Sequence, residues 1–529
     1  MNARLIKTIC IAGLSALTIA AVAMAQNPYF NQGRETVAYY LDLINSGNFE
    51  SAAGLWRPAS LEQATRLGIE YDGIKFKPDC LSPAVYNVEA YSAGVPSGID
   101  SQAEINDTTL RFRFILDMPN TGRASYHYIV LRTGGYFWLA YYHDVLTADW
   151  PVKTTRYFIF HISPNRLADY NDIAAAAMDD MVEKMASGLN LDSKRLAFLA
   201  EKKIHFYLCR TVGDIVKFAD VQSDGAYRAD ADVVFSTYLT NAAPVADLLI
   251  NYKMQKLPRR SDNFMRSGLR AALAGGWQRS ADVLLDFGEY ILKYNLIEID
   301  TLLKETFGED NNMTDIAVPA QACFAEYLVQ RFGLDKYLNC FARLSAVNLP
   351  DDSLRYPVIK DAVAGAFGTD WTSIASGLTQ YIAKRNRHGG PMYPGQVKVD
   401  KVLLEKDGLK ISSSKKWVQV AFSGGENKLF DVGIVFGKDP ALAGITSDLM
   451  KVQYQNYALY DGFRYGLRLD KNEIGLYDYA VNRLVAKYVT GFDPDPAYYD
   501  TTANAMTAYF DIGLLGANSP DMSDAVIIR

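Results

Sequence analysis

The chain reads Ala-Pro-Val-Ala-Asp-Leu-Leu over residues 243–249. Pro244 has no backbone N–H and fits only the first turn of a helix, so the sequence predicts a helix that begins near Ala243. Residues 232–236 are rich in Val and Phe, which favours a strand directly before that helix. The other elements of the central region are predicted from their order along the chain relative to this strand and helix.

Strand and helix patterns alternate on the N-terminal side of this unit. Apolar residues recur at helical spacing over 169–187, and short aromatic or β-branched runs precede and follow that stretch. The predicted order is strand 157–162, helix 169–187, strand 204–208, helix 212–219, a Gly-Ala turn at 225–227 and strand 232–236. We therefore expect one region of mixed helices and strands over residues 156–386.

That order resembles the peptidase MA-like group, the gluzincin metallopeptidases. Two later segments agree with it. Residues 324–328 followed by 332–336 resemble the helical hairpin after the active site of that family, and 366–371 leading into 381–382 resembles its closing helices. For a complete member, the resemblance implies zinc-dependent peptide hydrolysis.

The positions that would hold zinc in such a peptidase carry other residues. A complete member has a helix reading H-E-x-x-H-L-L here, so Ala243 replaces the first histidine, Pro244 the water-activating glutamate and Asp247 the second histidine. Residues 264–269 correspond to the next helix, where Ser267 replaces the glutamate ligand. Zinc hydrolysis needs three protein ligands, an open position and a base. We expect no catalytic residues, no bound metal, no cofactor and an inactive metallopeptidase homologue.

The histidines do not suggest a substitute metal site. None of the five has a partner at the i, i+4 spacing of a helical ligand pair, and His161 and His205 fall within predicted strands, which favours hydrogen-bonded core residues. Asp247 and Glu289 offer only oxygen ligands, which make a poor zinc site. The five are His127, His143, His161, His205 and His388.

Residues 1–25 have the pattern of a cleaved export signal: a charged start, an apolar stretch and Ala23-Met24-Ala25 as a cleavage site. We therefore expect an exported protein, periplasmic or extracellular, with no stable membrane insertion after cleavage. The hydrophobic content of 49% and formal net charge of −6 are those of a globular chain without a basic surface for nucleic acid.

Residues 27–150 have helical patterns first, and alternating strand patterns over 110–116, 126–130 and 136–140 after them. This order resembles the cystatin-like, nuclear-transport-factor-like α+β domain, in which a curved antiparallel sheet forms a cone. Such cones either hold a pocket or serve as packing modules, and the second role is favoured.

Residues 391–529 consist of short strand patterns separated by turns, which indicates a β-sandwich of concanavalin-like or jelly-roll type. The predicted strands are 397–402, 409–412, 417–422, 429–436, 451–460, 465–469 and 473–477. Aromatic residues concentrate near the middle of this region, where they either bind a ligand such as a sugar ring or form a tyrosine-rich core and rim. The candidate ligand-binding aromatics are Tyr457, Tyr460, Phe463 and Tyr465.

The sequence as a whole predicts a multidomain α+β protein: a cone, a degenerate peptidase-like domain and a sandwich. The leading hypothesis is a non-catalytic exported protein that binds a peptide, protein or glycan partner. One alternative is a hydrolase that acts through a non-zinc site in the sandwich, for which Asp461 and Glu473 are candidate carboxylates. Another is a structural component of the cell envelope. The sequence does not decide whether Cys323 and Cys340 form a disulfide.

Overall fold

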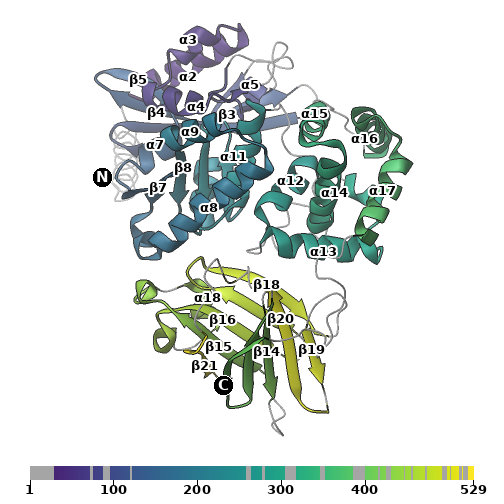
Figure 1. Ribbon diagram of the computed structural model, residues 1–529. Coiled ribbons are helices and arrows are strands. Elements are labelled where there is room, and N and C mark those ends of the chain that lie inside the picture. Colours follow the sequence, from purple (N-terminus) through teal and green to yellow (C-terminus); the bar gives the residue numbers. More distant parts are fainter. Residues whose placement is uncertain are drawn as a thin grey trace, which may run out of the picture. The chain divides into compact units, whose positions relative to one another are not determined.

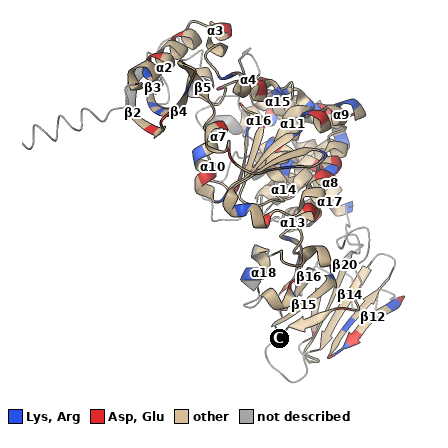
Figure 2. Ribbon diagram, turned by 90° about the vertical axis from the view of Figure 1, so that its left-hand side faces the viewer, with Lys and Arg blue, Asp and Glu red and all other residues tan. Residues whose placement is uncertain are grey.

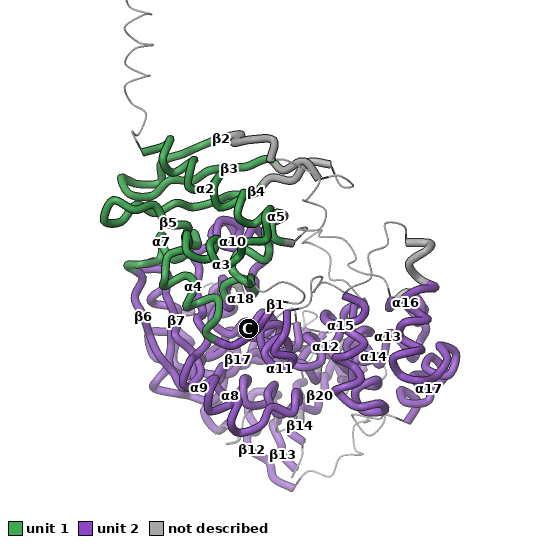
Figure 3. Tube along the Cα trace, turned by 90° about the horizontal axis from the view of Figure 1, so that it is seen from above, with its two compact units in different colours: residues 1–66, 73–149, 229–231 green, residues 67–72, 150–228, 232–529 purple. Residues whose placement is uncertain are grey.

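The structure is a computed structural model, in which the chain forms two compact units (Figure 3). Unit 1 contains residues 1–66, 73–149 and 229–231, and unit 2 contains 67–72, 150–228 and 232–529. The residues that the structure describes are 29–71, 76–86, 96–118, 122–257, 264–276, 280–303, 317–345, 352–384, 400–414, 417–423, 431–445, 447–453, 457–470, 473–490, 497–500, 502–511, 515 and 522–528. The predicted export signal, 1–25, lies outside these residues. Within these ranges no helix is both long enough and apolar enough to cross a bilayer.

The protein is a mixed α and β chain with several separate sheets (Figure 1). Unit 1 has four helices among its described residues before a four-stranded antiparallel sheet in the order β2-β3-β4-β5, and the short helix α7 after it. Its elements are α2 (Phe30–Asn45), α3 (Phe49–Ala53), α4 (Pro58–Thr65), α5 (Pro83–Tyr86), β2 (Pro96–Asn106), β3 (Thr109–Met118), β4 (Gly122–Thr133), β5 (Tyr136–Ala140) and α7 (Tyr142–Leu146). Val37, Tyr40, Leu41 and Ile44 are all buried, as their helical spacing predicts. The sequence does not predict strand β2, because that stretch is polar and its pairing with β3 shifts register three times.

A carboxylate is buried in the core of unit 1. Asp79 is 1% exposed and accepts hydrogen bonds from the hydroxyls of Tyr40 and Tyr128, each at 2.9 Å. Burial first, and then the charge of Asp79, raises the pKa of both tyrosines well above the usual value, so both remain protonated donors. The three side chains join helix α2, strand β4 and the segment before α5.

Removing one donor from this network is expected to destabilise unit 1. In Tyr40→Phe, the buried Asp79 loses a charge-assisted hydrogen bond, so the free energy of unfolding should fall by about 1.5–3 kcal/mol. The matched control is Tyr39→Phe on the same helix, where the side chain is 56% exposed and the change should stay below about 0.5 kcal/mol. Urea unfolding followed by tryptophan fluorescence measures both, and equal effects would show that the network does not stabilise the core.

Unit 2 begins with a five-stranded sheet in the order β6-β7-β8-β10-β9. Strands β7, β8 and β10 are parallel, whereas the edge strands β6 and β9 are antiparallel to their neighbours. The elements of this part are β1 (Glu70–Tyr71), β6 (Val152–Thr154), β7 (Phe158–Ile162), η1 (Pro164–Asp169), α8 (Asp172–Gly188), α9 (Ser193–Lys202), β8 (Ile204–Leu208), α10 (Val212–Ala219), β9 (Gly225–Arg228), β10 (Val233–Ser236), α11 (Ala243–Met254) and β11 (Lys256–Leu257).

Two details of this region differ from the prediction. Residues 225–228 form the edge strand β9 instead of a turn, because they pair with β10 over four residues. Helix α9 is an addition to the predicted order; it is capped by the Asp192 side chain, which accepts from the Arg195 N–H at 2.8 Å. Helix α8 carries Asp, Glu and Lys, and α9 carries Lys, Arg and Glu, so each helix has both signs of charge (Figure 2).

Helices α12 to α17 follow, and two glycines allow α14 to lie close to its neighbours. A Cβ at Gly268 would lie 2.6 Å from the Gln321 carbonyl oxygen, and one at Gly288 would lie 2.0 Å from that of Pro319. Both positions therefore exclude larger residues. The helices are α12 (Phe264–Ala274), α13 (Ala281–Lys293), η2 (Ile299–Leu303), α14 (Ala317–Phe332), α15 (Leu334–Leu344), α16 (Asp352–Phe367) and α17 (Trp371–Lys384).

The Cys323–Cys340 bridge that the sequence leaves open is not formed. Cys323 on α14 directs its thiol to the Leu285 carbonyl oxygen at 3.0 Å, whereas Cys340 is buried on α15. Burial raises the pKa of the Cys340 thiol to about 12. The two residues therefore act as small buried side chains.

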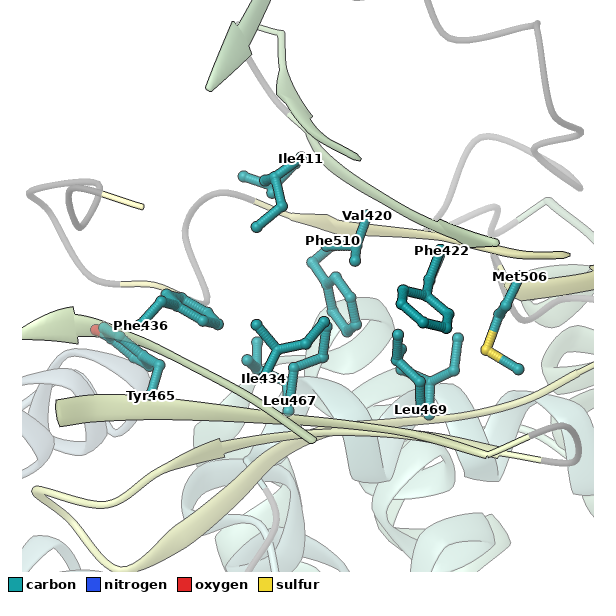
Figure 4. Packing of buried hydrophobic residues seen from close by; sticks show 14 of the residues in the cluster. Ile411, Val420, Phe422, Ile434, Phe436, Tyr465, Leu467, Leu469, Met506 and Phe510 are labelled. Atoms are coloured by element: carbon teal, nitrogen blue, oxygen red, sulfur yellow. The ribbon is translucent and has the colours of Figure 1, made fainter. Parts of the chain in front are cut away.

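The C-terminal part of unit 2 contains two five-stranded sheets, β12-β13-β14-β20-β19 and β18-β17-β16-β15-β21. Apolar side chains from both sheets form one core, in which Ile434, Leu467 and Leu469 of one sheet face Val420, Phe422 and Phe510 of the other (Figure 4). The strands are β12 (Lys401–Lys406), β13 (Leu409–Ser413), β14 (Trp417–Ser423), β15 (Asp431–Lys438), β16 (Phe463–Asp470), β17 (Glu473–Asp478), β18 (Arg483–Val489), β19 (Ala497–Asp500), β20 (Ala505–Asp511) and β21 (Val526–Ile528).

One predicted strand of this part is wrong. Residues 451–460 include the end of helix α18 (Asp448–Gln453) and the short helix η4 (Tyr457–Tyr460), with η3 (Pro440–Leu442) earlier in the same connection. The aromatic residues of this segment pack on the outside of a sheet. Their spacing along the chain nevertheless resembles that of a strand, which accounts for the wrong prediction. Strands β18 to β21 are additions to the predicted set.

Candidate functional site

A cavity of about 240 Å³ in unit 2 is lined by Ala243, Pro244 and Asp247, three of the four positions to which the resemblance assigns the zinc-site residues of a complete peptidase. Its wall includes the first turn of α11, the start of edge strand β9, helix α12 and the turn between β17 and β18. The residues from these four elements that bear on its chemistry are Asp224, Ala243, Pro244, Asp247, Arg270 and Arg483.

Helix α11 begins at Ala243, with Pro244 in its first turn, as the sequence predicts. The helix is buried from Pro244 to Tyr252, so its first turn lies at the cavity while the rest is enclosed by protein. The side chains of Ala243 and Pro244 contain no atom that could bind a metal ion. The positions of the first histidine and the glutamate therefore contribute only an apolar edge to the cavity.

Asp247, at the position of the second histidine, is held by two arginines of α12. Arg266 donates from Nε to Oδ1 and from a terminal nitrogen to Oδ2, both at 2.9 Å, and Arg270 lies 3.4 Å from Oδ2. The Asp247 side chain is 5% exposed and that of Arg266 is 14% exposed. This two-point ion pair occupies both oxygens of the carboxylate.

Ser267, at the position of the glutamate ligand, points toward α14. Its hydroxyl donates to Gln321 Oε1 at 2.7 Å, and Gln321 in turn donates to the Leu302 carbonyl oxygen at 3.2 Å. Ala243 and Pro244 have no side-chain atom that could bind a metal, and Asp247 and Ser267 are bonded to other side chains. These four residues therefore do not fit a zinc ion. Among the described residues, no group of three or more His, Cys, Asp or Glu is placed to hold a metal ion.

Three further polar residues line the cavity, and one of them, Tyr238, is influenced electrostatically by the other two, Asp224 and Arg483. Asp224 is exposed as a residue, yet desolvation by nearby protein atoms raises the pKa of its carboxyl group. Burial, and then the charge of Asp224, raises the pKa of Tyr238. Desolvation lowers the pKa of Arg483, but a guanidinium remains protonated at neutral pH.

Arg483 is the first residue of β18, and the turn that joins β17 to β18 contacts the region around the cavity. Thr240 donates its hydroxyl to the Val481 carbonyl oxygen, and Asn171 donates to that of Ala480 at 3.2 Å. Arg483 itself reaches Met181 Sδ at 3.7 Å. A cation of the sandwich therefore lies at a wall made largely by residues more than 200 positions earlier.

Sequence reasoning missed the arginines at this site. Arg266 and Arg270 have the i, i+4 spacing that places both on one face of α12, so their pairing with an acid on a neighbouring helix had a sequence signal. No such signal exists for Arg483, whose position depends on how a distant turn packs.

The aromatic candidates of the sandwich lie in packed surroundings. Tyr465 is 2% exposed, stacks on Phe436 and donates its hydroxyl to the Leu515 carbonyl oxygen at 2.7 Å (Figure 4). It belongs to the core and is not placed to touch a ligand, which corrects the prediction for this residue. Tyr457, Tyr460 and Phe463 are partly buried against Val435, Met450 and Tyr479. Their packing agrees with the alternative of a tyrosine-rich core and rim.

The two candidate carboxylates of the sandwich lie at opposite ends of strand β16. Asp461 precedes the strand and accepts from the Gly444 N–H at 2.6 Å, whereas Glu473 follows it and pairs with Lys487 at 2.6 Å. A strand of eight residues extends roughly 25 Å. Glycosidic cleavage needs carboxyl groups about 5–10 Å apart, so these two do not form such a pair.

His161 and His205 come together on neighbouring strands. His161 Nε2 lies 3.1 Å from His205 Nδ1, and the His161 ring stacks on Tyr207 with centroids 4.3 Å apart. Both are partly buried and hydrogen bonded, as expected for core histidines. Of the others, His143 is fully buried in unit 1, His127 is on β4, and His388 lies outside the described residues.

Comparison with models of known protein families and with curated protein sequences gives no match for this chain. Function is therefore inferred from the geometry of the site.

The ion pair at Asp247 makes a testable contribution to stability. In Arg266→Met, a buried carboxylate loses its two-point partner, and the free energy of unfolding should fall by about 3 kcal/mol. Arg270→Met is the matched control on the same helix face, since its side chain is 35% exposed and its contact is longer; we expect about 1 kcal/mol or less. Urea unfolding of the full chain measures both.

The double variant Arg266→Met/Asp247→Leu separates the ion pair from simple loss of packing. Because it removes the buried charge together with its partner, it should be more stable than Arg266→Met alone. Additive losses in the double variant would contradict the assignment of Asp247 as a carboxylate that depends on Arg266.

Proposed function

We propose that this is an exported, non-catalytic binding protein whose inactive metallopeptidase-like core binds an extended segment of a peptide or protein partner. The observation that carries the proposal is the Asp247 site. A cavity borders Ala243, Pro244 and Asp247, and the carboxylate at its wall is bonded by Arg266 and Arg270, which supports a binding site without a metal. A site of this kind can contact a ligand but has no group to activate water.

The sheet supports binding of an extended segment. Strand β9 is at the edge of its sheet, and its first residue, Gly225, borders the cavity. An edge strand offers unpaired backbone groups to which a peptide adds as a further strand. Gly225 lies beside Pro244, since a Cβ on Gly225 would be 3.3 Å from Pro244 Cγ, so one end of a peptide bound in this way would lie near the first turn of α11.

Other observations favour this proposal over the alternatives. A glycan site built on Tyr465 is disfavoured, because that side chain is in the core. A hydrolase that uses Asp461 and Glu473 is disfavoured by the strand that separates them. A structural role in an envelope assembly has no specific observation in its favour.

The absence of peptidase activity is tested on the purified exported chain. Because the residues at the four zinc positions do not fit the metal, elemental analysis should find far less than one zinc per chain. Hydrolysis of fluorescent casein should match a buffer blank and should not respond to EDTA, with an active zinc peptidase as the assay control. Stoichiometric zinc together with EDTA-sensitive cleavage would overturn the proposal.

Peptide binding at β9 is tested by hydrogen–deuterium exchange with a pool of random, N-acetylated hexapeptides. Residues 223–228 and the first turn of α11 should exchange more slowly with the pool present, because added backbone hydrogen bonds protect an edge strand. Strand β19, an edge strand of the sandwich, is the internal control and should not change. Protection at β19 but not at β9 would place the peptide elsewhere.

A further inference from the structure

Arg483 is a cation of the cavity wall that, within the described part of the chain, has no carboxylate at ion-pair distance. Its hydrogen bond there is to Met181 Sδ at 3.7 Å. The acids that influence it electrostatically are engaged with other cations: Asp478 with Arg464 at 3.1 Å and Asp282 with Lys184 at 3.6 Å. A partly buried guanidinium whose hydrogen bond is to sulfur, and whose neighbouring acids are paired elsewhere, is incompletely compensated.

Helices α11 and α12 add positive potential to the cavity wall. Arg270 lines the cavity and makes only the longer, 3.4 Å contact with Asp247, whose oxygens already bond Arg266. The first turn of α11 also lies at the wall, and its N-cap residue, Ala242, provides no side-chain cap for the first N–H groups. A helix N-terminus carries a partial positive charge that favours anions.

The balance of charge limits which anion fits. The groups at or directly bonded to the cavity wall are three guanidiniums, from Arg266, Arg270 and Arg483, and two carboxylates, from Asp224 and Asp247. One positive charge is therefore in excess. A single carboxylate neutralises it, whereas a doubly charged phosphate would leave the site negative.

We propose that this cavity binds a carboxylate group of the peptide partner, held by Arg483 and Arg270 at the first turn of α11. The inference rests on the proposed peptide-binding function and names the chemical group that the site selects. The carboxylate is either the C-terminus of the peptide or an acidic side chain, since both present the same planar pair of oxygens to a guanidinium.

The test measures retention of four hexapeptide pools on the immobilised, exported full chain, quantified by mass spectrometry. All pools are N-acetylated and exclude Asp, Glu and Lys at the random positions. One ends in an amide, one in a free carboxylate, one in an amide with a single fixed Glu, and one in an amide with a single fixed Lys. The free-carboxylate and Glu pools distinguish the two sources of the group.

We expect one or both carboxylate pools to be retained about 10- to 100-fold more than the plain amide pool, as for a hydrogen bond to a charged partner. Arg483→Gln should remove this preference, and Arg270→Gln should reduce it. Lys487→Gln is the matched control, because Lys487 is on the same strand, pairs with Glu473 and does not line the cavity. It should leave the preference unchanged.

A second measurement does not depend on any variant folding. With the unaltered chain, the preference for the carboxylate pools should fall as salt is raised, since part of the attraction is screened. Asp224→Asn removes the one exposed carboxylate of the wall and should keep or strengthen the preference.

Three results would overturn the inference. Equal retention of amide and carboxylate pools, insensitive to Arg483→Gln, would leave peptide binding standing and exclude the carboxylate site. Preference for the Lys pool, lost in Asp224→Asn, would show that the cavity selects a cation instead. Retention of no pool would remove both the inference and the proposed function.

Discussion

The pairing of Asp247 with Arg266 constrains the start of α11, because a carboxylate with 5% exposure needs charged or hydrogen-bonding partners, and here one arginine reaches both of its oxygens. The pair fixes α12 beside α11 at the point where α11 begins. Gly268, between the two arginines, lets the other side of α12 lie against the Gln321 backbone of α14. The first turn of α11, which borders the cavity, is therefore held in place by an ion pair on one side and close helix packing on the other.

The parts of the fold that sequence predicts well are those where one physical pattern dominates. Helix α11 begins where Pro244 allows it, and strands β7, β8 and β10 are rich in apolar residues, interrupted by His161 and His205, because the inner strands of the sheet are largely buried. Prediction fails where two patterns overlap. The aromatic spacing of residues 451–460 resembles a strand, although those side chains pack from a short helix onto a sheet, and the polar strand β2 owes its existence to pairing with β3.

The candidate site is predictable only in part, for a related reason. From order along the chain, the resemblance predicts which positions would carry zinc ligands, and the residue types there predict that no metal binds. What those residues contact depends on tertiary partners: Asp247 bonds to Arg266, and Ser267 to Gln321. Arg483 reaches the cavity from the first residue of a strand of the sandwich, and nothing in its local sequence distinguishes it from a surface arginine.

The turn between β17 and β18 is held by its main chain, since Thr240 and Asn171 donate to the carbonyl oxygens of Val481 and Ala480. Asn482 has a φ of +49°, which small polar residues and glycine tolerate best. The side chains of Ala480 and Val481 are themselves buried, at 1% and 9% exposure, so this junction has room only for small or apolar residues beside its fixed backbone path. Related chains would then be expected to keep such residues here together with the shape of the turn.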